Sequence, residues 1–165
     1  MVRLATKSDL PAVLAIRRQV HMLHVNGRPD IYRMPENAAE FDQTLLDSLK
    51  TPDMYVFVVD AATDALPSDT PSPQIVGYAV VQYKRFGALC LAKERTSAFI
   101  DEFGVDEAHR HHGYGRELMN AILAHAKKLH ADDLTLNVWS FNKNAEAFYK
   151  SFGMTPKQQT LELPL

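Results

Sequence analysis

A short loop with two glycines, residues 110–115, separates a segment with strand character from an amphipathic segment with helical character. Strand character covers residues 97–105. On the downstream segment apolar residues recur at helical spacing, namely Leu118, Met119, Ile122, Leu123 and Ala126. Residues 134–138 predict another buried strand, so the unit is strand, loop, helix, strand with a right-handed parallel crossover. This unit favours an α/β fold.

The loop has the chemistry of an anion-binding site, and it consists of Arg110, His111, His112, Gly113, Tyr114 and Gly115. Glycines one residue apart allow a tight turn and a close approach of the backbone to a ligand. The first N–H groups of the following helix lack partners within the helix, and the helix dipole is positive at that end. Arg110 adds a full positive charge. We therefore expect the loop to bind phosphate or pyrophosphate.

The spacing of the loop differs from two common nucleotide-binding motifs. Leu118 stands where the dinucleotide pattern G-x-G-x-x-G has its third glycine. A Walker A loop needs Gly-Lys followed by Ser or Thr, which the loop lacks. The alternative to a phosphate site is a plain glycine-assisted turn between a strand and a helix.

The loop also resembles the R/Q-x-x-G-x-G/A motif with which the GNAT family of N-acetyltransferases holds the pyrophosphate of coenzyme A. Residues 142–154 resemble the second signature of that family, N-x-x-A-x-x-F-Y-x-x-x-G-F/M. The two motifs and their connecting strand cover about residues 97–155. The resemblance implies the GNAT fold: an α/β fold with a mixed central sheet of about six to seven strands, about four flanking helices, and a splay between the fourth and fifth strands.

Length and composition agree with one domain spanning residues 1–165. A formal net charge of −2 disfavours nucleic acid as a partner. The sequence has no apolar run long enough to span a bilayer and no signal-peptide pattern at its start, so a cytoplasmic protein without a membrane partner is expected. Cys90 is the single cysteine, which excludes an internal disulfide, and we expect a small apolar residue there.

The remaining sequence predicts further helices and strands. Thr6 or Ser8 is a candidate cap for a first helix that ends near His24, and residues 36–49 show a second helical pattern. Strands are expected at residues 2–4, 54–59 and 75–83 and, as an alternating edge strand, at 159–163. The proline-containing segment 61–74 is expected to be a mobile hairpin loop, with a docking site for a partner as the alternative.

Acetyl transfer to an amine needs a group that takes up the proton of the amine. The resemblance implies an acidic residue on the strand 97–105, where Asp101 and Glu102 are the candidates. Alternation along a strand puts Asp101 on one face with Phe103, and Glu102 on the other with Ile100 and Gly104. We favour Glu102 for the proton relay. The alternative is that each carboxylate is an ordinary solvated or hydrogen-bonded strand residue.

A glycine inside an apolar strand suggests a bulge or a close approach of the backbone, and Gly104 has this position. The resemblance implies that the acetyl-pantetheine arm of acetyl-CoA enters here, beside Phe103, Gly104 and Val105, with the backbone N–H near Val105 for the thioester oxygen.

The resemblance further implies a general acid for the departing thiolate at Tyr149, and coenzyme contacts from Asn142 and Ala145. Residues 145, 148, 149 and 152 have helical spacing, so Tyr149 is alternatively a core aromatic residue. Asn142 lies at the expected start of that helix and is also a candidate cap.

Histidines are frequent, but they do not predict a metal centre. His109, His111 and His112 lack the cysteine or carboxylate partners of a recognisable zinc spacing. We expect His21 and His24, three residues apart on the first helix, to be surface or core imidazoles, with a place in the acceptor groove as the alternative. Residues 25–35 form a polar and aromatic loop, which we expect on the acceptor side or in solvent.

These features together predict an N-acetyltransferase that moves an acetyl group from acetyl-CoA to the primary amine of a small molecule, by direct attack in a ternary complex and without a metal. The first alternative is a protein N-terminal or lysine acetyltransferase, which accepts a peptide amine. The second is a non-catalytic acyl-CoA-binding sensor. Members of the family often form dimers, so a homodimer is compatible with the resemblance.

Overall fold

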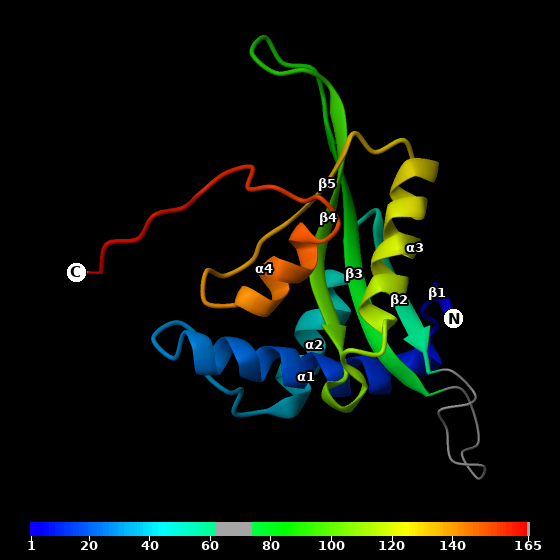
Figure 1. The fold of residues 1–165 in the computed structure, drawn as a ribbon, viewed down its shortest axis with the longest axis vertical. Coiled ribbons are helices and arrows are strands. Elements are labelled where there is room, and N and C mark those ends of the chain that lie inside the picture. Colours follow the sequence, from blue (N-terminus) through cyan, green and yellow to red (C-terminus); the bar gives the residue numbers. More distant parts are fainter. Residues whose placement is uncertain (62–73, 165) are drawn as a thin grey trace.

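A single mixed sheet organises the computed structural model, which describes residues 1–61 and 74–164. The strand order is β1-β2-β3-β4-β5, with antiparallel pairs from β1 to β4 and a parallel pair between β4 and β5. Figure 1 shows the sheet at the centre of the molecule, with the hairpin of β3 and β4 extending beyond the other strands. The strands are β1 (Val2–Leu4), β2 (Met54–Asp60), β3 (Ile75–Phe86), β4 (Arg95–Val105) and β5 (Asp133–Leu136).

Helices cover both faces of the sheet, because alternate residues of the central strands are buried on either side (Figure 1). One face packs against α1 (Leu10–Gly27) and α2 (Ala38–Ser48), with Val13, Ile16 and Leu45 fully or almost fully buried. The opposite face packs against α3 (Tyr114–Lys128) and α4 (Lys143–Lys150). A short 3-10 turn, η1 (Lys7–Asp9), precedes α1, and another, η3 (Glu107–His109), follows β4.

Strand β4 extends beyond the end of its neighbour β5, and the sheet is open at that point. The parallel pairing runs only from Ser97 with Asp133 to Ile100 with Leu136. Residues 102–105 pair with β3 alone among the described strands. At the same point β4 has a bulge, because Val80 pairs with Glu102 and Val81 with Ile100, which leaves Asp101 as the extra residue. The splay predicted between the fourth and fifth strands is therefore confirmed.

The structure confirms the α/β fold and corrects details of the sequence prediction. The sheet has five strands in the described residues, fewer than the six to seven expected. Residues 159–163, predicted as an edge strand, do not form a strand. Leu161 and Leu163 are 90% and 82% exposed, so the alternating pattern is not matched by a buried face or by a neighbouring strand. The first helix continues to Gly27, beyond His24. Most of the predicted hairpin loop 61–74 lies outside the described residues.

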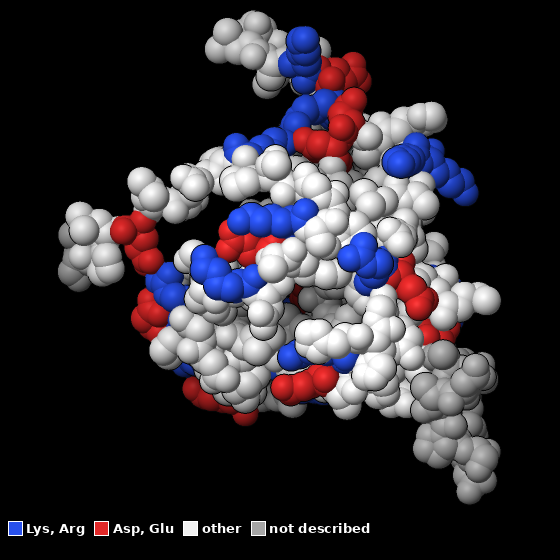
Figure 2. All heavy atoms as spheres, viewed as in Figure 1, with Lys and Arg blue, Asp and Glu red and all other residues white. Residues whose placement is uncertain are grey.

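Acidic and basic side chains alternate over the face of the molecule in Figure 2, without an extended region of one sign. This agrees with the small formal net charge of −2. No helix within the described residues is long and apolar enough to cross a lipid bilayer.

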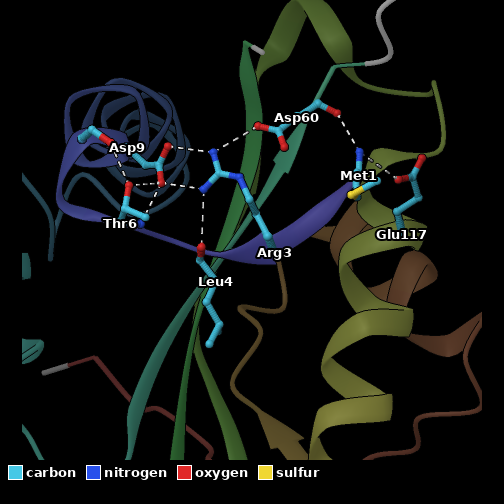
Figure 3. Close-up of polar contacts among 8 residues, drawn as sticks. Met1, Arg3, Leu4, Thr6, Asp9, Asp60 and Glu117 are labelled. Carbon is cyan, nitrogen blue, oxygen red and sulfur yellow. Dashed lines mark hydrogen bonds and ion pairs between the residues drawn. The ribbon is translucent and has the colours of Figure 1, made fainter. Parts of the chain in front are cut away.

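An ion-pair network fixes the start of the chain to the sheet (Figure 3). The guanidinium of Arg3 on β1 donates to both carboxylate oxygens of Asp9, at 2.7 and 2.9 Å, and to Asp60 on β2 at 3.3 Å. The carboxylate of Asp9 also accepts hydrogen bonds from the backbone N–H and hydroxyl of Thr6. The hydrogen bond from Arg3 and those from Thr6 hold the pKa of the buried Asp9 carboxyl well below its usual range, although burial opposes them.

We predict that Asp9→Asn destabilises the fold by roughly 1–3 kcal/mol at pH 7, because it removes charged hydrogen bonds from a buried position. Asp9 has a lower pKa in the folded state, so its stabilisation is present above the unfolded pKa of about 3.9 and is lost as the pH falls below that value. The difference from wild type in urea unfolding is therefore fully present at neutral pH and narrows as the pH is lowered below about 4. Asp47→Asn, at an exposed carboxylate, is the control. Equal effects of the two substitutions contradict this account.

Candidate active site

The loop predicted to bind pyrophosphate folds as a tight turn between β4 and α3. Gly113 adopts a left-handed backbone conformation with φ of 91° and caps α3, which begins at Tyr114. His111 is also left-handed, with φ of 66°, which is uncommon for a residue with a side chain. Among the described residues, apart from its two chain neighbours, no heavy atom lies within 4 Å of the position that a Cβ of Gly113 would occupy. The start of α3 is therefore approachable, as a phosphate site at a helix N-terminus requires.

Hydrogen bonds to α1 hold the base of this loop. Gln19 on α1 donates from Nε2 to Asp106 at 2.7 Å and accepts from the backbone N–H of Glu107 at 2.9 Å. The second oxygen of Asp106 lies 2.5 Å from Nδ1 of His109. Arg110 is held more loosely, with a 3.3 Å hydrogen bond to the carbonyl of Val105 and an ion pair with the exposed Glu107 at 3.8 Å. Both contacts are long, so the guanidinium of Arg110 can turn toward a ligand while the backbone around it is fixed.

The second signature forms α4, which packs beside the loop 110–115. Asn142 caps this helix, since its side-chain oxygen accepts from the N–H of Ala145 at 3.1 Å. Phe148 lies 3.4 Å from the position that a Cβ on Gly115 would occupy, so the lack of a side chain at Gly115 lets α4 pack closely against the loop. The ring centroid of Phe103 on β4 lies 5.6 Å from that of Phe148. The two signatures, distant in sequence, therefore meet at the open end of β4.

A pocket of about 210 Å³, which we call the acceptor pocket, lies where β4 and β5 diverge. Walls come from α1, α2, β3, β4, α4 and residues 136–142. Six of the predicted site residues line it: Asp101, Glu102, Phe103, Asn142, Ala145 and Tyr149. Gly104, Val105 and the loop residues Arg110, His111, His112, Gly113, Tyr114 and Gly115 are not part of its lining. The pocket thus collects the predicted catalytic residues, and the loop lies apart from it.

The carboxylate of Glu102 is fully engaged by its neighbours. Nε of Arg17 on α1 donates to both oxygens of Glu102, at 2.8 and 2.9 Å, and the hydroxyl of Tyr78 on β3 donates at 2.7 Å. Nη1 of Arg17 also donates to the carbonyl of Phe41 at 2.8 Å. Burial and the Glu102 charge raise the pKa of Tyr78 well above its usual value, so this phenol remains a donor.

Asp101 differs from Glu102 in its surroundings. It is exposed at the bulge of β4 and lines the acceptor pocket, and its side chain has no hydrogen bond or ion pair within the part of the chain that the structure describes. The bulge also corrects the predicted alternation of side chains. Ile100 lies in the core under α3, whereas Glu102 faces α1, so these two residues do not share a face.

Gly104 makes the close backbone approach that was one of its two predicted roles, while the bulge lies three residues earlier, at Asp101. A Cβ on Gly104 would lie 2.7 Å from Val20 and 2.9 Å from Tyr78. Helix α1 therefore rests directly on the backbone of β4 at this point. Contacts this short leave no space for any side chain.

Tyr149 is half-buried between the pocket and Phe103, whose ring centroid is 6.1 Å away. Burial raises the pKa of Tyr149 to about 12. The hydroxyl therefore stays protonated at neutral pH and can donate a hydrogen bond into the pocket.

Sequence reasoning missed several pocket residues. Arg17 and Tyr78 carry no local signal, because their roles depend on contacts with Glu102 between distant elements. Trp139 lines the pocket, and its Nε1 donates to the hydroxyl of Tyr32 at 3.2 Å. The composition of the loop around Tyr32 indicated only that aromatic residues lie on the acceptor side, not that Trp139 lines the pocket. His24, named as a candidate for the groove, does line it.

The histidines do not gather into a metal site. In the described ranges, no group of three or more His, Cys, Asp or Glu side chains could hold a metal ion. Burial first, and then the nearby charge of His21, lower the pKa of His24 below its ordinary value. Cys90, expected to be a small apolar residue, is exposed at the end of the β3–β4 hairpin.

Comparison with known proteins supports this picture. No curated protein matches the sequence. Among solved structures, the tetramutant of the BH1408 protein from Bacillus halodurans has a TM-score of 0.86 and 31% identity, covering 100% of this chain and 99% of that chain. The apo aminoglycoside antibiotic 6'-N-acetyltransferase AAC(6')-IG from Acinetobacter haemolyticus has a TM-score of 0.68 and 14% identity, with 100% and 97% covered. AAC(6')-Iy, in complex with the bisubstrate analog CoA-S-monomethyl-acetylneamine, has a TM-score of 0.69 and 11% identity, with the same coverage.

The last two structures are similar in fold alone, because their identities are low. The family model for the acetyltransferase (GNAT) family matches residues 23–154, which include both sequence signatures, the splayed strands and most residues that line the acceptor pocket. The match covers most of the chain and agrees with the resemblance found in the two signatures. The chain therefore belongs to the acetyltransferase (GNAT) family.

Proposed function

We propose that the chain transfers an acetyl group from acetyl-CoA to the primary amine of a small molecule, by direct attack in a ternary complex. The observation that carries this proposal is the acceptor pocket itself, which joins a free carboxylate and a protonated tyrosine at the open end of β4. Acetyl-CoA supplies the activated acetyl group as a thioester. The amine nitrogen bonds to the acetyl carbon, and the carbon–sulfur bond breaks.

The phosphate end of acetyl-CoA fits the loop 110–115. Its left-handed Gly113 leaves open space before α3, and Arg110 brings a positive charge to the same place. Residues 101–105 of β4 expose backbone groups on the side that β5 leaves, where an extended ligand arm can pair with them. AAC(6')-Iy, a protein of similar fold, is known in complex with a coenzyme A bisubstrate analog.

Within the pocket we assign different roles to the two carboxylates. Asp101 is unpaired, so it takes up the proton of the acceptor amine, directly or through a water molecule. Glu102, which was favoured for this role on sequence grounds, has both oxygens engaged by Arg17 and Tyr78. It holds α1 and β3 at the correct distance around the pocket.

Tyr149 acts on the sulfur. A thiol has a pKa of about 8.5, far below that of Tyr149, so a departing thiolate does not take the proton of this phenol outright. The hydroxyl instead donates a hydrogen bond that stabilises the charge as it develops on the sulfur. Asn142 and Ala145 begin the helix that positions Tyr149.

Removal of the loop cation tests the coenzyme site. Arg110→Ala is expected to raise the KM for acetyl-CoA roughly 10- to 100-fold, the loss expected for one hydrogen bond to a charged group. The KM for the acceptor and the melting temperature should change little. Lys127→Ala is the matched control, because it removes a cation from the last turn of α3, the helix that follows the loop. Steady-state kinetics that show equal effects of both variants exclude a phosphate site at this loop.

A comparison of Asp101→Asn with Glu102→Gln tests the two carboxylate roles. Asp101→Asn is expected to lower kcat roughly 100-fold or more, the usual contribution of a general base, without a change in melting temperature. Glu102→Gln is expected to lower the melting temperature, because it leaves the Arg17 guanidinium unpaired. Loss of turnover in Glu102→Gln with unchanged stability, and an active Asp101→Asn, would assign the proton relay to Glu102.

Tyr149→Phe tests the hydrogen bond to the sulfur. It is expected to lower kcat roughly 3- to 10-fold, the contribution of one neutral hydrogen bond. Since the pKa of Tyr149 is about 12, its hydroxyl stays protonated from pH 7 to pH 10. The ratio of the wild-type and variant kcat should therefore be constant over that range, as measured by thiol release. Equal kcat values would make Tyr149 only a core residue, and tight coenzyme binding without turnover on any amine would indicate a non-catalytic sensor.

A further inference from the structure

The acceptor pocket combines polar side chains with an apolar part of its wall. Aromatic rings come from Phe41, Phe103, Trp139 and Tyr149, and Val20 and Leu136 add aliphatic surface. Trp139 is held in place, because its ring nitrogen donates to Tyr32 and its ring stacks on Phe141 with centroids 6.2 Å apart. Its polar atom is thus already satisfied, and the indole presents apolar surface to a ligand.

The pocket has no unpaired cationic arginine or lysine among the described residues that line it. Arg17 is the one arginine or lysine in this lining, and its Nε donates to Glu102 while its Nη1 donates to Phe41 and Thr44. The guanidinium of Arg17 also lies over the ring of Phe41, 4.4 Å from the centroid. Because Glu102 compensates the charge of Arg17, a carboxylate or phosphate on the acceptor would meet no uncompensated arginine or lysine charge among these residues.

A second arginine beside the pocket is neutralised in the same way. Arg28 lies over the ring of Trp139, 5.0 Å from the centroid, and pairs with Asp30 and Glu162, each at 2.7 Å. The lining residue His24 is neutral near pH 7, because burial lowers its pKa. Asp101 remains the charge without a partner in the described chain, so the pocket attracts a cation and repels an anion.

The volume of the pocket also restricts the acceptor. About 210 Å³ is less than the roughly 300–1,000 Å³ of sites that hold drug-sized ligands. A single ring on a short chain suits this space better than a molecule of several sugar rings.

Resting on the function proposed above, we propose that the acceptor is an arylalkylamine: a primary ammonium on an aromatic body, with no carboxylate or phosphate beside the amine. The ammonium faces Asp101, which accepts its proton before the free amine attacks the thioester. The ring lies against Trp139 and Phe41. An amino acid with the same ring is excluded, since its carboxylate would lie near Asp101 with no cation to compensate it.

Three compounds that share one ring separate charge from shape: 2-phenylethylamine, phenylalanine and phenylalaninamide. With the full chain and acetyl-CoA, kcat/KM for 2-phenylethylamine is expected to exceed that for phenylalanine roughly 100-fold or more, as like-charge juxtaposition predicts. Phenylalaninamide, whose amide is neutral, should recover most of this difference. Kanamycin and an N-terminal peptide should be poorer than 2-phenylethylamine.

Binding provides a second measurement that needs no turnover. Titration calorimetry with the enzyme saturated with coenzyme A gives the dissociation constants of 2-phenylethylamine and phenylalanine. Asp101→Asn is expected to narrow the gap between these constants roughly tenfold, because it removes the repulsion. Glu94→Gln, at an exposed carboxylate just before β4, is the matched control and should preserve the gap.

Different results overturn different conclusions. Equal or better use of phenylalanine, or an unchanged gap in Asp101→Asn, overturns the arylalkylamine assignment while acetyl transfer stands. Preference for the peptide over 2-phenylethylamine also overturns the assignment and favours a protein N-terminal acetyltransferase. Absence of thiol release with every amine, from an enzyme that binds coenzyme A, overturns the proposed function as well.

Discussion

The candidate site depends on the unequal lengths of β4 and β5. The parallel pair ends at Ile100 and Leu136, but β4 continues for five more residues, 101–105, along β3. Backbone N–H and C=O groups without a strand partner are costly when water is excluded, unless a ligand satisfies them. The bulge at Asp101 begins where this pairing ends, and it turns that carboxylate out of the sheet. One interruption of the sheet thus creates both the opening and the polar group beside it.

Helix α1 connects the two ends of the proposed site. Through Arg17 it binds Glu102 on β4, and through Gln19, about half a turn later, it binds Asp106 and Glu107 at the base of the phosphate loop. The same helix supplies His21 and His24 to the acceptor pocket. The acceptor side and the coenzyme side are therefore held by one rigid element, and their separation does not depend on the long loops.

Much of this arrangement could be predicted from sequence, because local patterns determine it. The loop 110–115 combines glycine geometry with a helix start, and Asn142 is a recognisable helix cap, so both were placed correctly. The bulge at Asp101 was not predicted, because a bulge depends on the register of the neighbouring strand. The pairing of Arg17 with Glu102 joins residues 85 positions apart and has no local signal. The segment 159–163 shows the reverse error, since an alternating pattern cannot reveal whether a partner strand exists.

The position of Gly104 has a consequence for how such a pocket can diversify. Val20 of α1 packs directly on its backbone, with no space for a methyl group. A side chain there would act as a wedge that lifts α1 and moves His21 and His24 outward with it. The absence of a Cβ at Gly104 thus determines how closely α1 approaches β4, and with it the width of the acceptor pocket. New specificities in this scaffold are more accessible through Trp139 and the loop around Tyr32, whose side chains can change in size without displacing the helix.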